Sequence, residues 1–148
     1  MGGNPVNRIL EGEVVSLDLS SFRKALISLQ KGMARATAAP DDKELRDAVI
    51  QRFEYTYELS WKMIKRCVEQ ESPHPAEIDH LSFGDLLRDA AERGLISDVE
   101  RWMDYREQRN VTSHTYDEEK AAIVYRYALE FSHDAAQLLT ALERRGNA

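Results

Sequence analysis

Apolar side chains recur at spacings of three and four residues along most of the chain, which is the period of helices with one buried face. The first such stripe follows Asp18 and Ser20, either of which could cap a helix N-terminus. Its members are Phe22, Leu26, Leu29, Met33 and Ala36. Pro40 and the two aspartates after it end this predicted helix and begin the next one.

A second, longer helix is predicted from about Asp42 to Glu71. Its inward stripe consists of Val49, Phe53, Tyr57, Ser60, Ile64 and Cys67. The sequence Ser72-Pro73-His74-Pro75 ends it, because proline lacks the amide hydrogen that a helix interior requires. We expect a loop from there to His80.

Two further helices are predicted between this loop and the last stripe. A short one begins at Ser82 and ends at Gly94, since glycine suits the position after a helix C-terminus. Ser97 and Glu100 form a capping box for the next helix, which we expect to end near His114.

The last helix begins at Asp117, where negative charge is favoured by the helix dipole. Its apolar positions follow a helix-bundle seam without a break: Ala121, Val124, Ala128, Phe131, Ala135, Leu138 and Leu142. The only candidate strand, at residues 14–17, is short. The predicted fold is therefore all-α, an up-and-down four-helix bundle with one extra short helix. Residues 1–17 form a tail, and 18–148 form a single domain.

Composition agrees with this fold. A chain of 148 residues, 43% hydrophobic and 31% charged, is typical of one globular domain. No apolar run approaches the ~18 residues of a membrane helix, and the N-terminus shows no secretory signal. Cys67 is the only cysteine, so we expect a small core residue in a reducing, cytoplasmic setting. The net charge of −6 argues against coating long nucleic acids, but it permits a local basic site.

Candidate chemistry gathers on the fourth predicted helix, at Arg106, Arg109, Asn110 and His114. Arginine offers a planar fork of donors for phosphate oxygens, and histidine transfers protons near neutral pH. In a continuous helix, Arg109 and His114 would lie roughly 140° apart. They are thus a poor pair within one chain, and a second subunit could supply one of them.

Two segments resemble a known family. Residues 109–114 resemble the HEPN superfamily motif, in which arginine precedes histidine by five positions, and Thr115-Tyr116 extends the motif to its longer form. Residues 46–62 resemble the second helix of the nucleotidyltransferase substrate-binding family. The two segments stand in the same order as in that family.

The resemblance implies a homodimer in which both subunits contribute to a shared cleft. It also implies a separate minimal nucleotidyltransferase as partner, using ATP or another nucleotide. Some relatives are toxins that cleave RNA until the partner adds adenylyl groups to the motif's tyrosine, here Tyr116. The alternative is a metal-independent endoribonuclease with Arg109, Asn110 and His114 as its catalytic residues.

Gln51, Glu54, Glu58 and Lys62 share one face of the second helix. In one interpretation this face carries only an exposed Glu58–Lys62 pair. In the other, Glu54, Glu58 and Lys62, together with Arg106, bind the partner or its substrate. We expect Trp61 to belong to the core.

Several functions are not expected. His74 and His80 have no accompanying ligand pair at metal spacing, so we expect neither a metal nor another cofactor. The chain lacks the glycine-serine motif and acidic pair of a nucleotidyltransferase catalytic domain. The leading hypothesis is a binding subunit that presents Tyr116 to the partner; the endoribonuclease comes second, and a structural bundle with an inactive site third.

Overall fold

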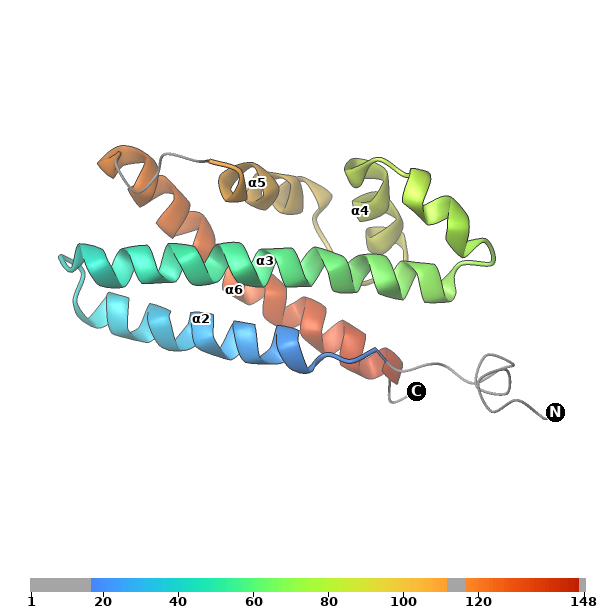
Figure 1. The fold of residues 1–148 in the computed structure, drawn as a ribbon, viewed down its shortest axis with the longest axis horizontal. Coiled ribbons are helices and arrows are strands. Elements are labelled where there is room, and N and C mark those ends of the chain that lie inside the picture. Colours follow the sequence, from blue (N-terminus) through green and yellow to red (C-terminus); the bar gives the residue numbers. More distant parts are fainter. Residues whose placement is uncertain (1–16, 112–116, 147–148) are drawn as a thin grey trace.

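The computed structural model describes residues 17–111 and 117–146, and this part of the chain is all-helical, as predicted (Figure 1). Its helices are α2 (Ser20–Ala38), α3 (Lys43–Glu71), the 3-10 helix η1 (Pro75–His80), α4 (Phe83–Glu92), α5 (Val99–Arg109) and α6 (Glu118–Gly146). No helix in these two ranges has the length and hydropathy needed to cross a bilayer.

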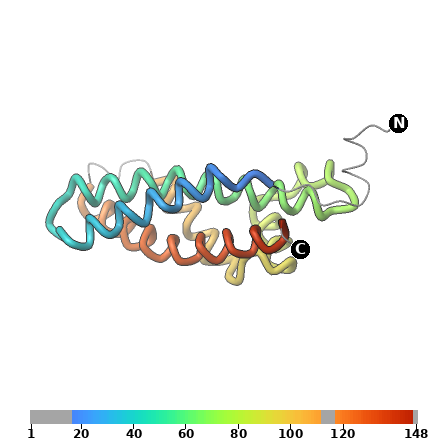
Figure 2. Tube along the Cα trace, turned by 90° about the horizontal axis from the view of Figure 1, so that it is seen from below, coloured from blue at the N-terminus to red at the C-terminus, as the bar shows by residue number. Residues whose placement is uncertain are grey.

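The long helix α3 is the centre of the bundle and contacts every other helix. Helix α2 runs antiparallel beside it, and α6 crosses both (Figures 1 and 2). Helices α4 and α5 lie along a different side of α3 from α2 (Figure 1). The middle of α3 is thereby enclosed by α5, α6 and α2.

Local sequence signals explain the ends of most helices. The side chains of Asp42, Ser82 and Asp117 each accept hydrogen bonds from backbone amides in the first turn of the helix that follows. Asp18 accepts one from the amide of Ser20, the first residue of α2. Gly94, with φ of 80°, follows α4 in the left-handed conformation that glycine tolerates best. The predicted starts of these helices are confirmed.

The predicted apolar stripes form one core. All their members are buried except Met33, which is half-buried. At the centre of the core, the ring of Phe131 lies 5.2–5.7 Å from four other aromatic rings, those of Phe53, Tyr57, Trp102 and Tyr105. This cluster fastens α5 and α6 to α3.

The fourth predicted helix is shorter than expected. It begins at Val99, because the carboxylate of Asp98 rather than Ser97 accepts the amide hydrogen of Arg101. It ends at Arg109 and not near His114. The backbone amide of Asn110 donates a hydrogen bond to the backbone oxygen of Arg106 at 3.0 Å, which completes the last turn. The β-branched Val111 and Thr112 that follow have low helix propensity. The bundle thus has three long helices and two short ones in its described part.

One further expectation was incomplete. The connection after α3, predicted as a loop, contains η1, which starts with Pro75 at a position where a missing amide hydrogen costs nothing. The predicted tail at residues 1–17 lies outside the described residues except for Leu17, and so does most of the short strand candidate.

Candidate functional site

The last turn of α5 lies against the middle of α3 and brings Arg109 to Glu58. The Nε atom of Arg109 lies 3.4 Å from Oε1 of Glu58, and both side chains are about one third exposed, at 33% and 34%. The other carboxylate oxygen of Glu58 accepts a hydrogen bond from Nε1 of Trp61 at 3.2 Å. The carboxylate of Glu58 therefore contacts Arg109 with one oxygen and Trp61 with the other.

Arg106 belongs to the same group of side chains. Its guanidinium carbon lies 4.4 Å from the centre of the Phe83 ring, within the range of a cation–π interaction. The Phe83 ring in turn meets the ring of Trp61 edge-on, with centroids 5.8 Å apart. We call these five residues, Glu58, Trp61, Phe83, Arg106 and Arg109, the Arg109 site.

Three helices build the Arg109 site: Glu58 and Trp61 come from α3, Phe83 opens α4, and both arginines come from the last turn of α5. Residues three apart on a helix are neighbours, so the two guanidinium groups share one face of α5. Arginine binds phosphate by paired hydrogen bonds in one plane. The Nε of Arg109 is buried and makes no hydrogen bond to any described residue. Two arginines on one helix face make the end of α5 a candidate anion site, while the Nε of Arg109 is itself buried against Glu58.

The other predicted site residues are placed as follows. Glu54 lies half-buried on α3, one turn before Glu58. Lys62 is exposed, and the ion-pair partner of Glu58 among the described residues is Arg109 rather than Lys62. Asn110 is exposed and caps α5. His114 and Tyr116 lie outside the described residues.

The early end of α5 changes one argument from the sequence. The offset of roughly 140° between Arg109 and His114 assumed a helix continuing to His114, and the helix ends at Arg109. The expectation of a cleft shared by two subunits therefore rests on the family resemblance alone.

Two members of the Arg109 site were not predicted. Trp61 was expected in the core, but it is half-buried at the core's edge and contacts Glu58 and Phe83. Phe83 was not singled out at all. The spacing of three between Glu58 and Trp61 signals that contact, whereas the approach of Phe83 depends on how α4 packs.

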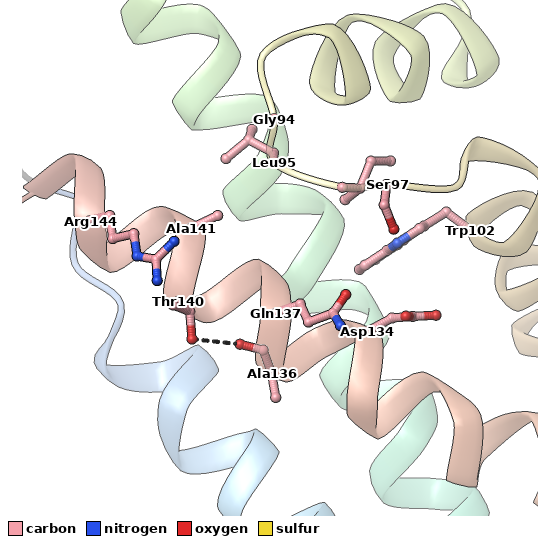
Figure 3. Close-up of a pocket in the computed structure, with 11 residues that line it drawn as sticks. Gly94, Leu95, Ser97, Trp102, Asp134, Ala136, Gln137, Thr140, Ala141 and Arg144 are labelled. Carbon is pink, nitrogen blue, oxygen red and sulfur yellow. Dashed lines mark hydrogen bonds between the residues drawn. The ribbon is translucent and has the colours of Figure 1, made fainter.

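A separate cavity of about 550 Å³ lies between residues 94–97 and the C-terminal half of α6 (Figure 3). Its carboxylate, Asp134, already accepts hydrogen bonds from Arg101 and Tyr105. The pKa of the Tyr105 phenol is raised mainly by burial and secondly by the hydrogen bond to Asp134, so the phenol stays neutral. No predicted site residue lines this cavity, so the Arg109 site is the better candidate.

A double-mutant cycle tests the Glu58–Arg109 pair. Because both side chains are partly screened by solvent, we expect Glu58→Gln and Arg109→Gln to show a coupling free energy of about 0.2–1 kcal/mol. The measurement is urea unfolding of the wild type, both single variants and the double variant. The more exposed Arg23–Glu143 pair, with side chains 44% and 38% exposed and two hydrogen bonds between them, is the comparison pair and should couple in the same range. Additive effects of the two substitutions would contradict the pairing.

Comparison with known proteins agrees with the fold. Residues 17–144 match the family described as nucleotidyltransferase substrate binding protein like. A Haemophilus influenzae protein named Probable ribonuclease HepT is 46% identical over 96 residues. That match covers 65% of this chain and 66% of the relative, just under two thirds of the relative's length.

Two solved structures share the fold. A Haemophilus influenzae structure, described as the fold of a substrate binding domain of a nucleotidyltransferase, has a TM-score of 0.80 and 36% identity, covering 85% of this chain and 99% of that one. A crystal structure from Thermus thermophilus has a TM-score of 0.63 and 30% identity, covering 82% of this chain and 98% of that one.

Fold and site together define a helical bundle with an arginine site where the short helix α5 meets the central helix. The chain belongs to the nucleotidyltransferase substrate-binding protein family, the family that its sequence resembles.

Proposed function

We propose that this protein is the partner subunit of a separate minimal nucleotidyltransferase, and that as a HEPN-type homodimer it presents Tyr116 for adenylylation. One observation carries the proposal: the Glu58–Arg109 pair joins the two segments of family resemblance, which are far apart in the sequence. Family membership over residues 17–144 supports the same role.

In the proposed transfer, the phenol oxygen of Tyr116 attacks the α-phosphorus of ATP. A phosphorus–oxygen bond forms at the tyrosine, the bond to the β-phosphate breaks, pyrophosphate leaves, and the phenol proton passes to a base or to water. The partner supplies the catalytic groups. The new phosphodiester would place negative charge seven residues after Arg109, where a guanidinium can pair with it.

A second function is metal-independent RNA cleavage, in a toxin-antitoxin type of pair. The name of the Haemophilus relative favours it, and so does the presence of two arginines, Arg106 and Arg109, in the last turn of α5. In this reaction a ribose 2′-hydroxyl attacks the neighbouring phosphorus and the 5′-oxygen leaves, producing a 2′,3′-cyclic phosphate. His114 would move the proton, and Arg109 would stabilise the charge on the phosphorane.

The two functions are compatible. An adenylyl group on Tyr116 would bring bulk and negative charge into the segment that also holds Arg109 and His114. It would therefore oppose the binding of an RNA phosphate at the same place. The partner would then act as the switch that stops cleavage.

Association with the proposed partner, a separate minimal nucleotidyltransferase, tests the leading proposal. We expect one stable complex on size-exclusion chromatography with light scattering, containing two copies of this chain. Lys62→Glu, which reverses an exposed charge near the Arg109 site, should weaken the complex. Lys120→Glu, an equal change on an exposed residue of α6, should leave it unchanged. Two proteins that elute separately at micromolar concentration would refute the partnership.

A further inference from the structure

A second cavity, which we call the α2–α3 groove, lies between α2 and α3. Its volume is about 480 Å³, and it is lined by Ser21, Lys24, Ala25, Ser28, Gln51, Arg52, Tyr55 and Thr56. Ligand pockets commonly span ~300–1,000 Å³, so a mononucleotide-sized group can enter it. None of the residues of the Arg109 site lines this groove.

The groove is positive although the whole chain is acidic. Its lining holds two cations, Lys24 and Arg52, and no carboxylate. Helix α2 carries four basic residues and no acidic one, in a chain with net charge −6. Arg52 donates a hydrogen bond to a backbone oxygen, that of Ser28, and no carboxylate in the lining neutralises either cation. The groove therefore suits an anionic group.

Arg52 is held in a fixed position within this groove. Its Nη1 donates a hydrogen bond to the backbone oxygen of Ser28 at 2.9 Å. A Cβ atom at Gly32 would lie only 2.8 Å from the same Nη1. Glycine inside a helix is destabilising relative to alanine, and here its missing side chain leaves the space in which the Arg52 guanidinium lies against α2.

Tyr55 gives the groove an aromatic surface. It is 60% exposed, the most exposed of the large hydrophobic side chains in the described part of the chain. An aromatic ring beside basic side chains is the usual means of binding single-stranded nucleic acid, because bases stack on the ring while cations contact the phosphates. Tyr55 and Glu58 are three residues apart on α3, so the groove adjoins the Arg109 site.

We propose that the α2–α3 groove binds one nucleotide unit, with its base stacked on Tyr55 and its phosphate at Lys24 and Arg52. The unit is either a free nucleoside phosphate or one residue of a single-stranded RNA. This site is distinct from the Arg109 site, and its occupancy requires neither adenylylation of Tyr116 nor cleavage by His114.

The test measures binding by the full-length protein without its partner. One probe is AMP, by isothermal titration calorimetry. The other is a fluorescein-labelled 2′-O-methyl hexanucleotide, by anisotropy at low salt; it lacks the free 2′-hydroxyl that cleavage needs. We expect Tyr55→Ala to weaken binding about 5- to 150-fold, since stacking contributes ~1–3 kcal/mol per base. Lys24→Gln should weaken binding and lower its salt dependence by about one phosphate contact.

Lys120→Gln, an equal charge change outside the groove, should bind as the wild type does. Loss of AMP binding in the groove variants identifies a free nucleotide as the ligand, and loss of hexanucleotide binding alone identifies an RNA strand; both support the site. The proposal is overturned if the wild type binds neither probe, or if Tyr55→Ala binds equally well. It is also overturned if Tyr55→Ala changes the oligomeric mass, because the groove would then be a subunit interface.

Discussion

RNA cleavage by this protein should persist in EDTA and fall about 10²–10⁴-fold in the His114→Ala variant. That range is typical of losing a general acid or base. Persistence in EDTA follows because the proposed reaction uses only side chains: a histidine for the proton and arginines for the phosphate. The measurement is the initial rate on a labelled single-stranded RNA under single-turnover conditions.

His80→Ala is the matched control, since His80 lies at the end of η1 and belongs to no proposed site. It should cleave RNA at the rate of the wild type. Cleavage that disappears with EDTA, or that is equal in the wild type and His114→Ala, would rule out the metal-independent ribonuclease. It would leave the partner-subunit proposal standing, because that role needs no cleavage.

Arg109→Lys should lower the same cleavage rate by about 10²-fold or more, although the positive charge is kept. Removal of one donor aimed at a developing oxyanion commonly costs about 10²–10³ in rate. Lysine cannot reproduce the planar fork of a guanidinium, and a shorter reach from α5 would also break the contact with Glu58. The measurement is kcat and KM, from initial rates over a range of RNA concentrations that extends to saturation.

Arg106→Lys is the control one turn earlier on the same helix. Its guanidinium lies over the Phe83 ring, so we expect it to assist RNA binding and to change KM more than kcat. If Arg109→Lys cleaves as fast as the wild type, or if both variants change only KM, Arg109 does not stabilise the transition state.

The sequence predicted those helix ends and buried helix faces that are determined by residues close together in the chain. The side chains of Asp42 and Ser82 start their helices because each reaches amides two or three residues away. Gly94 ends α4 because its backbone needs a positive φ. The long stripes of α3 and α6 predicted the core, since burial follows the helical period directly.

The parts that the sequence did not predict depend on tertiary packing. Ser97 and Asp98 are both suitable caps, and the choice of Asp98 shortened α5 at its start. Glu58 had a possible partner four residues away in Lys62, yet it pairs with Arg109, which lies far later in the chain. Phe83 joins the site only because the helix that it opens packs against α3 and α5.

In the α2–α3 groove, too, one feature can be predicted from the sequence and another depends on tertiary packing. The absence of acidic residues from α2 is visible in the sequence. The position of Arg52 against α2, and the role of Gly32 in allowing it, appear only when the two helices are packed.

Intact-mass spectrometry shows directly whether a nucleotidyltransferase partner modifies this chain. The protein is incubated with the partner nucleotidyltransferase, ATP and Mg²⁺, and its modified peptide is then sequenced. We expect added adenylyl mass on the wild type and on the control Tyr125→Phe, and none on Tyr116→Phe. An unmodified wild type in a mixture where the two proteins form a complex, or equal modification of Tyr116→Phe, would contradict it.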